Sequence, residues 1–420
     1  MALRVLLATT AQWLSTARLA AALAEVGCQV EAVCRPGHPL EHVSSVGRRY
    51  NFSATSAAAS FERAIVASAP DLVLSCDEPA LGYLKTVHAG ASPAVRALIE
   101  RSIGDIRQLD TALARSALLE LAQQEGIATP ATSILHSAAD VDVQIEKLGL
   151  PLVLKADATA GGQGVRVLTR RSDARTFYTR LRGPVSAPRT LSRVLRDRDL
   201  RPVFNYFERR TTVVTAQEFI EGPEGNVGVA CWQGEVLACL TLEVVTTWCV
   251  RGPSSVLRVV DNPAMASAAR KLVRRLNFTG FCGFDFIFRA DGTPLLLEMN
   301  ARPTQIAHLA LGPGKDLAAA FAFAAAGGRA SGVLRHDRPA CTSNPLIALF
   351  PQEWQRDPES DMLLQAFHDV PWSEPGLVTA GMNAHVSPGG SRPWDPLLAL
   401  FRKKAPRPTL AAPDASNTFP

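Results

Sequence analysis

The sequence predicts a protein of the α/β and α+β classes, with an open α/β domain at the N-terminus and a β-rich domain after it. Apolar strands and Ala/Leu-rich helices alternate through the first hundred residues, as in βαβ units. Strand patterns then dominate from Leu152 to Val245. Two further strands, Cys282–Ala290 and Thr293–Asn300, are joined by an Asp-Gly turn.

The composition is typical of a folded globular protein. The chain has 420 residues, of which 47% are hydrophobic and 20% charged, so it can bury a large core. A formal charge of +5 does not by itself indicate nucleic-acid binding. The longest uncharged apolar run, Leu317–Ala326, is shorter than the roughly 20 residues of a membrane helix. The N-terminus predicts a strand and not a secretory signal, so we expect no membrane association and a cytoplasmic location.

The N-terminal domain is predicted to cover residues 1–106. No GxGxxG motif follows its first strand, so we expect no dinucleotide site there. Asp77 and Glu78 follow a strand, at the edge where open α/β sheets place ligands. A helix N-cap followed by an acid in the first turn explains the two residues equally well. The expected strands are Val5–Ala8, Val30–Cys34 and Asp71–Ser75, with helices over Thr16–Val26 and Phe61–Ala69. A single helix, Gln108–Gln124, is expected after this domain.

A buried strand that ends in a lysine precedes a loop of small residues. Lys155 closes the apolar run, and Ala158–Gly164 forms the loop. Backbone N–H groups of such a loop can approach phosphate oxygens, while the lysine supplies a point charge. The loop is not a Walker motif, because GKS/T is absent and a strand follows. A hairpin without any ligand is the alternative interpretation of this segment alone.

The hairpin near residue 290 carries the strongest chemical signal. If Asp291 and Gly292 form a tight turn, counting back along both strands places Asp285 opposite Glu298. Opposed carboxylates destabilise a sheet unless a cation lies between them, and oxygen ligands are those that Mg²⁺ prefers. Asn300 lies on the same face and adds a carbonyl oxygen. The alternative is a solvated pair of surface acids, which fits poorly with so apolar a strand.

The order of these segments resembles the ATP-grasp superfamily. Arg115, the Lys155 loop, the strand that contains Gln217 and the E-x-N-x-R sequence from Glu298 to Arg302 follow one another within about residues 110–325. The E-x-N-x-R ending is most similar to the carbamoyl-phosphate synthase and biotin carboxylase branch. The resemblance implies a pre-ATP-grasp domain followed by a two-lobed ATP-grasp fold. The implied segments are an ATP-grasp domain at 107–335 with a lid lobe at about 130–216, and a C-terminal extension at 336–402.

The resemblance also implies a role for each residue, with ATP and Mg²⁺ as cofactors and Mn²⁺ as an alternative ion. Basic residues and the glycine loop would contact phosphates, the strand between the lobes would hold adenosine, and the hairpin would bind metal. Lys155, Arg302 and Arg258 would be catalytic, although a structural ion pair is the alternative for Arg302. The implied nucleotide contacts are Arg115, Lys155, Gly161, Gly162, Gln163, Gly164, Gln217, Glu218, Ile220 and Glu224; the implied metal ligands are Asp285, Glu298 and Asn300.

The implied activity is an ADP-forming ligase that activates a carboxylate as an acyl phosphate and joins it to an amine. Its partners would be small-molecule carboxylates and amines, and a homodimer is compatible with the sequence. The alternatives are a bicarbonate-activating enzyme of the carboxylase or carbamoyl-phosphate synthase type, and a non-catalytic ATP-binding regulatory module. No biotin-carrier or glutaminase segment is evident, which disfavours a complete carboxylase in this chain.

Two segments depart from a plain ATP-grasp pattern. A basic insertion lies at about 180–210, and 13 Arg stand against four acids between Arg166 and Arg210. Nucleic-acid binding is the weaker interpretation, because aromatic residues are few there. A solvated helix, or a lid that meets phosphates and an acidic substrate, is favoured. The last segment, 403–420, contains four prolines and is expected to be disordered.

Overall fold

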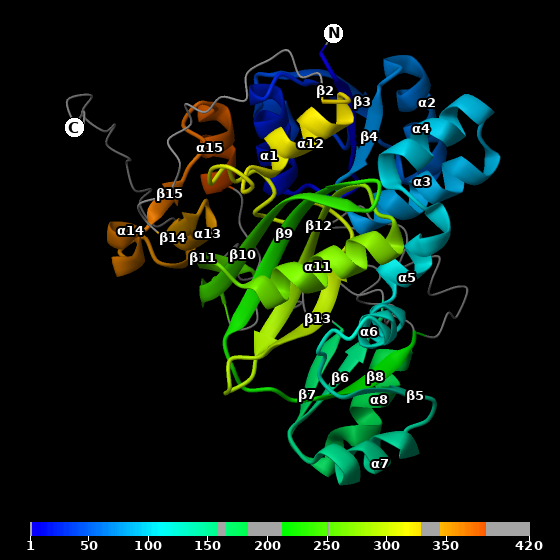
Figure 1. Ribbon diagram of the computed structural model, residues 1–420, viewed down its shortest axis with the longest axis vertical. Coiled ribbons are helices and arrows are strands. Elements are labelled where there is room, and N and C mark those ends of the chain that lie inside the picture. The colour runs from blue at the N-terminus through cyan, green and yellow to red at the C-terminus, as the bar shows by residue number, and fades with distance from the viewer. Residues whose placement is uncertain (1, 158–163, 184–211, 250–251, 329–344, 384–420) are drawn as a thin grey trace, which may run out of the picture.

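The computed structural model describes residues 2–157, 164–183, 212–249, 252–328 and 345–383. These residues form three β-sheets with surrounding helices, and the predicted mixed α/β class is confirmed (Figure 1). Most of the basic insertion and the whole of 403–420 lie outside the described residues. Within the described ranges, none of the helices combines the length and apolar composition that a membrane span requires.

The N-terminal domain is built on a parallel sheet of strand order β3-β2-β1-β4. An open parallel sheet was predicted, but β3 was not. The side chains of β3 are mostly exposed, and only the first, Val46, is buried. The apolar pattern that predicts a core strand is therefore missing from this edge strand. The strands are β1 (Arg4–Ala8), β2 (Gln29–Cys34), β3 (Val46–Asn51) and β4 (Leu72–Ser75). The helices are α1 (Leu14–Glu25), α2 (Ala57–Ser68), α3 (Glu78–Gly90) and α4 (Pro93–Ile103).

The prediction of one helix over Gln108–Gln124 is wrong. The chain forms α5 (Leu109–Leu113) and then α6 (Arg115–Gln124), with an extended residue, Ala114, between them. Asp157, far away in the sequence, accepts a hydrogen bond from Ser116 Oγ at 2.6 Å at the start of α6. The start of α6 therefore coincides with a long-range contact. Arg115 is the first residue of this helix.

A four-stranded antiparallel sheet of order β5-β8-β6-β7 forms the lobe at the bottom of Figure 1. Its helices α7 (Ala139–Leu148) and α8 (Ala174–Arg182) bury a separate small core with residues such as Leu152 and Leu154. The strands are β5 (Thr132–Leu135), β6 (Leu152–Ala156), β7 (Val165–Leu168) and β8 (Val214–Glu218). We call this unit the small lobe.

A seven-stranded sheet of order β13-β12-β9-β10-β11-β14-β15 occupies the centre (Figure 1). Residues of this sheet belong to two large clusters of buried apolar side chains. Helix α11 (Pro263–Leu276) contributes to the first cluster, and α12 (Leu317–Ala325) contributes to the second. Asn262 caps α11 by accepting a hydrogen bond from Met265 N. The strands are β9 (Glu224–Trp232), β10 (Glu235–Thr247), β11 (Ser254–Val260), β12 (Gly280–Phe288), β13 (Pro294–Asn300), β14 (Leu346–Leu349) and β15 (Phe367–Asp369).

The C-terminal extension is joined to this sheet. β14 pairs with β11, and β15 pairs with β14. Both strands lie beyond residue 335, where the sequence shows only short segments. The helices of the extension are α13 (Gln352–Arg356), α14 (Asp361–Gln365) and α15 (Pro375–Asn383). Two parts of the chain that are distant in sequence therefore build one continuous sheet.

The predicted pairing of Asp285 with Glu298 is confirmed, although the turn differs from the expected one. Arg289 N donates to Thr293 O, so the loop has three residues and not two. Gly292 adopts a φ of +83°, which glycine tolerates best. A bulge between Asp285 and Phe286 then shifts the register by one residue. The two departures cancel, and the acids meet as counting predicted.

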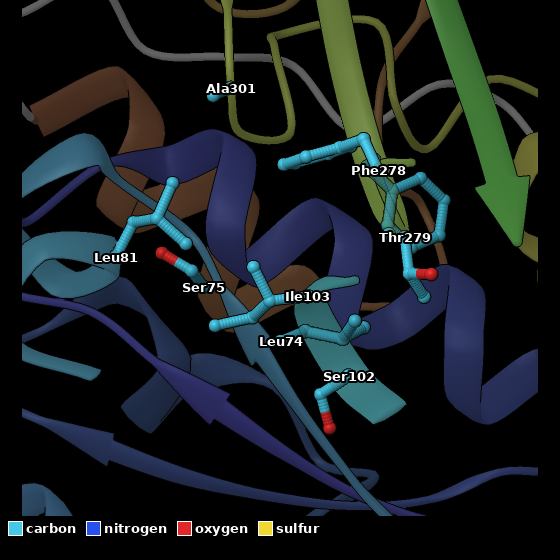
Figure 2. A pocket seen from close by; sticks show the side chains of 10 residues that line it. Leu74, Ser75, Leu81, Ser102, Ile103, Phe278, Thr279 and Ala301 are labelled. Carbon is cyan, nitrogen blue, oxygen red and sulfur yellow. The ribbon is translucent and has the colours of Figure 1, made fainter. Parts of the chain in front are cut away.

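A small internal cavity lies where the N-terminal domain meets the large sheet (Figure 2). Leu74 and Ser75 of β4 contribute from one side, and Phe278 and Thr279, just before β12, contribute from the other. The cavity leaves about 10 Å³ free, which is room for about one water molecule. It is therefore a packing gap at the domain junction, too small for a nucleotide.

Candidate active site

Two acids of the β12–β13 hairpin form the centre of the site. Asp285 Oδ1 accepts a hydrogen bond from Asn226 Nδ2 at 2.7 Å, and Oδ2 accepts one from Asn300 Nδ2 at 3.1 Å. Burial raises the pKa of Asp285 to about 7, and the neighbouring charge of Glu298 adds to this effect. Burial acts in the same direction on Glu298, but Arg115 and Lys155 outweigh it and hold its pKa below the usual range. The two acids therefore have different environments although they share one hairpin.

Arg115 and Lys155 bring positive charge to these acids from the other side. Arg115 forms an ion pair with Glu298, with Nε at 3.0 Å from Oε2, and its Nη1 donates to Ala156 O at 3.1 Å. Lys155 is 7% exposed. Burial, reinforced by the charge of Arg115, lowers the pKa of Lys155 to about 8, and Glu298 and Asp285 oppose that shift. The small lobe and the large sheet thus meet through opposite charges.

The residues predicted to hold adenosine lie at the connection between the two sheets. Gln217 and Glu218 end β8 in the small lobe, Ile220 follows in the linker, and Glu224 begins β9 in the large sheet. Gln217 Nε2 donates to Thr132 Oγ1 at 3.0 Å. Glu218 Oε2 accepts from Ala131 N at 3.2 Å and lies 3.4 Å from Arg289 Nη2. These side chains are tied to their neighbours, which leaves the linker backbone as the natural contact for a base.

Arg302 follows the hairpin and contacts the N-terminal domain. Its Nε donates to Glu78 Oε1 at 2.9 Å, and its Nη2 donates to Asn300 Oδ1 at 3.0 Å. The guanidinium carbon lies 4.5 Å from the ring centroid of Trp13. The ion pair considered as the alternative for Arg302 is therefore present. It also places Arg302 beside the hairpin, at the junction of the two domains.

Arg258 does not join this group. It lies on β11, three strands away from β12 in the sheet, and forms a half-exposed ion pair with Glu243 at 3.4 Å. Its neighbours Leu257 and Val259 pack in the cluster of α12, so alternation along the strand points Arg258 to the opposite face. The strand pattern of the sequence could not reveal how many strands separate β11 from the hairpin.

The glycine loop is described only at its end. Gly164 O accepts a hydrogen bond from Ala156 N at 2.8 Å, which closes the hairpin between β6 and β7. Gly161, Gly162 and Gln163 lie outside the described residues.

Sequence reasoning missed Trp13 and Asn226 and left the role of Glu78 open. Trp13 and Glu78 follow β1 and β4, at the edge where parallel strands end, and Glu78 had been considered there. Asn226 faces Asp285 only because β9 and β12 are neighbours, which no local pattern reveals. Asp77, by contrast, is structural: it caps α3 and accepts hydrogen bonds from Thr9, Thr10 and Ala11.

The donor set of the hairpin fits a divalent metal ion. Asp285, Glu298 and Asn300 offer carboxylate and amide oxygens, which are the ligands of Mg²⁺ and Mn²⁺. Asp285 lies opposite Glu298 and is hydrogen-bonded by two neutral amides, Asn226 and Asn300. Arg115 compensates for only one of the two acids. A cation placed between them would supply the missing charge.

Comparisons with known proteins agree with this geometry. The family model of the carbamoyl-phosphate synthase L chain, ATP binding domain, matches residues 110–329, just over half of the chain. D-alanine--D-alanine ligase of Cupriavidus taiwanensis is 25% identical over 214 residues, which are 47% of this chain and 56% of that protein. The chain thus spans a little over half the length of this relative.

Solved structures show the same fold. The biotin carboxylase domain of Hydrogenobacter thermophilus 2-oxoglutarate carboxylase, in complex with MgADP and bicarbonate, aligns with a TM-score of 0.56 at 17% identity, covering 77% of this chain and 69% of that one. L-amino acid ligase from Bacillus licheniformis aligns with a TM-score of 0.52 at 18% identity, covering 77% and 75%. By its matched domain and its fold, this chain belongs to the carbamoyl-phosphate synthase L chain ATP-binding family of the ATP-grasp superfamily.

Proposed function

We propose that this chain is an ATP-dependent ligase that activates a carboxylate as an acyl phosphate and joins it to an amine, releasing ADP and phosphate. One observation carries the proposal: Lys155 and Arg115 converge on the opposed acids Asp285 and Glu298 between two lobes. Phosphoryl transfer depends mainly on positioning and charge stabilisation, and this convergence can provide both.

In this proposal each residue binds or orients a reacting group. Lys155 and Arg115 hold phosphate oxygens, and the linker around Ile220 holds the base. Asp285, Glu298 and Asn300 would hold Mg²⁺, which when bound neutralises charge on the phosphates. Arg302 turns the carboxylate toward the γ-phosphate through its planar pair of N–H groups.

We further propose that the activated acid is an α-amino acid. Arg302 and Glu78 present a positive and a negative group 2.9 Å apart, and the Trp13 ring lies beside them. A zwitterion can satisfy both charges, with its carboxylate at Arg302 and its ammonium group at Glu78. Two proteins similar to this chain, a D-alanine--D-alanine ligase and an L-amino acid ligase, carry amino acids in their names. Bicarbonate, the substrate of the alternative, has no cationic group to pair with Glu78.

The test is ADP release with acids that differ only in the amino group. We expect alanine and other amino acids to stimulate ADP release with an amine acceptor, and propionate to fail. The Arg302→Lys variant should keep its ATP affinity and lose at least tenfold in carboxylate-stimulated release, since lysine lacks the planar fork. AMP and pyrophosphate as products, or bicarbonate as the only stimulating acid, would refute the proposal.

A further inference from the structure

A chain of side-chain hydrogen bonds leads from Asp285 into the large sheet. Asn226 lies directly opposite Asp285 in the pairing of β9 with β12, so both side chains share a face. Asn226 Nδ2 donates to Asp285 Oδ1 at 2.7 Å, and Ser254 Oγ donates to Asn226 Oδ1 at 3.1 Å. An ionised carboxylate can only accept, so the amide nitrogen must face Asp285 and the amide oxygen must face Ser254. The two hydrogen bonds thus fix the orientation of the Asn226 side chain.

The same chain continues into the C-terminal extension. Gln305 Nε2 donates to Ser254 O at 3.3 Å, and Gln352 Nε2, on α13, donates to Gln305 Oε1 at 3.3 Å. The next residue on β11, Ser255, bonds to the carboxylate of Glu353, which is 0% exposed. The start of β11 is therefore held at two successive positions by α13.

We propose that Asn226 is a positioning residue for the metal site, and that the C-terminal extension supports it through Ser254. This inference rests on the proposed function only in taking Asp285 as a metal ligand. The extension lies outside the segment that matches the family model. A segment outside the matched domain would thereby stabilise a site built within it.

The physical role of Asn226 is to restrict rotation of the Asp285 carboxylate. Asn300 Nδ2 holds one carboxylate oxygen and Asn226 Nδ2 holds the other. Without Asn226, a buried carboxylate would keep a single amide donor and could turn away from its partner acid. In known sites, substituting a residue that orients a metal ligand in this way lowers the metal affinity 10- to 100-fold. Ser254 lies one step beyond Asn226 in this chain, and Gln352 lies three steps beyond it, so their effects should be smaller.

The experiment measures Mn²⁺ affinity of the full chain in the presence of ADP, by the loss of the free-Mn²⁺ electron paramagnetic resonance signal. We expect Asn226→Ala to weaken Mn²⁺ binding at least tenfold, Ser254→Ala about threefold and Gln352→Leu about twofold. Gln355→Leu is the matched control, because Gln355 lies on the same helix but bonds to Gly381 O. It should leave Mn²⁺ affinity unchanged. ADP affinity without metal should stay within twofold in every variant.

The outcomes separate this inference from simple structural damage. Wild-type Mn²⁺ affinity in Asn226→Ala would overturn it. A parallel loss of Mn²⁺ affinity and of metal-free ADP affinity would also overturn it, because that result indicates general disruption. A wild-type chain that binds no Mn²⁺ would remove the metal site and the inference together. Graded Mn²⁺ losses in a chain that forms no amide with any tested acid and amine would support the inference and refute the proposed function.

Discussion

Two aspartates, half-buried Asp285 and buried Asp369, occupy opposite electrostatic environments. Asp285 faces Glu298, and its pKa is raised to about 7 by burial and by that neighbouring acid. Asp369, in the extension, lies 2.6 Å from Arg18 Nη2 and 3.0 Å from His308 Nε2. Burial acts to raise the pKa of Asp369, but Arg18 and His308 outweigh it and lower that pKa. The first acid faces a second acid, while the second is paired with two basic side chains.

This difference distinguishes a binding site from a structural connection. Arg18, His308 and Asp369 come from α1, from the turn after β13 and from β15, and together they join three parts of the chain. We call them the junction cluster. A buried charge pair gains little net stability, but it is costly to break once formed. Substitutions at Asp285 and at Asp369 should therefore affect different properties: ligand binding in one case and stability in the other.

The largest effect is expected at the hairpin. Glu298→Gln keeps the shape of the side chain but removes one ligand charge. We expect Mg²⁺-dependent ADP release to fall at least 10²-fold, because charge on the phosphates would be less well stabilised. The fold should be retained. Glu243→Gln, which changes the acid paired with Arg258, is the control and should stay within twofold. Near-normal turnover in Glu298→Gln would contradict the metal assignment.

The next effect concerns the junction cluster. Asp369→Asn should lower the free energy of unfolding by about 2 kcal/mol, because Arg18 remains buried without its counter-charge. ADP release per folded molecule should be almost unchanged. Urea unfolding followed by circular dichroism measures the loss. A change below about 0.5 kcal/mol, or a selective loss of turnover in the folded variant, would show that the cluster has another role.

A smaller effect follows from Lys155. Burial and Arg115 lower its pKa to about 8, and only its ammonium form attracts phosphate. The attraction is nearly complete at pH 7 and is lost as the pH rises through 8. ATP should therefore bind about tenfold more weakly at pH 9 than at pH 7. Calorimetric titration at both pH values gives this ratio, and Lys155→Met should be insensitive to pH over the same range. A wild-type affinity that is flat with pH would count against a phosphate contact.

The smallest effect sharpens the comparison between the two aspartates. Asp285→Asn removes a charge that forms no ion pair within the described part of the chain, so the free energy of unfolding of the metal-free chain should change by less than about 1 kcal/mol. The same substitution should abolish tight Mn²⁺ binding. A loss of stability as large as that of Asp369→Asn would mean that Asp285 is a structural residue.

The sequence was most informative where partners are close along the chain. Asp285 and Glu298 could be paired because a single turn separates their strands, and the extra loop residue was offset by the bulge. The roles of Arg115 and Gln217, in contrast, came from a resemblance to a family and not from the residues themselves.

Long-range contacts account for what could not be predicted. The break at Ala114 coincides with the hydrogen bond from Ser116 to Asp157. Arg302 forms its ion pair with Glu78, which is more than 200 residues away in the sequence. Asn226 and Arg258 depend on the strand order of the large sheet, which places the first beside Asp285 and the second three strands away. Such an order follows from the packing of distant segments. No period or motif along the chain encodes it.

The most direct test of the proposed ligase activity follows an oxygen atom. An amino acid labelled with ¹⁸O in its carboxylate, chosen as the most active of a panel, is incubated with ATP, Mg²⁺ and an amine acceptor. The carboxylate oxygen that attacks the γ-phosphate stays with phosphorus when the amine displaces it. The account predicts one ¹⁸O in the released phosphate for each amide formed, together with ADP. Amide formation with unlabelled phosphate, or with the label in AMP, would contradict it.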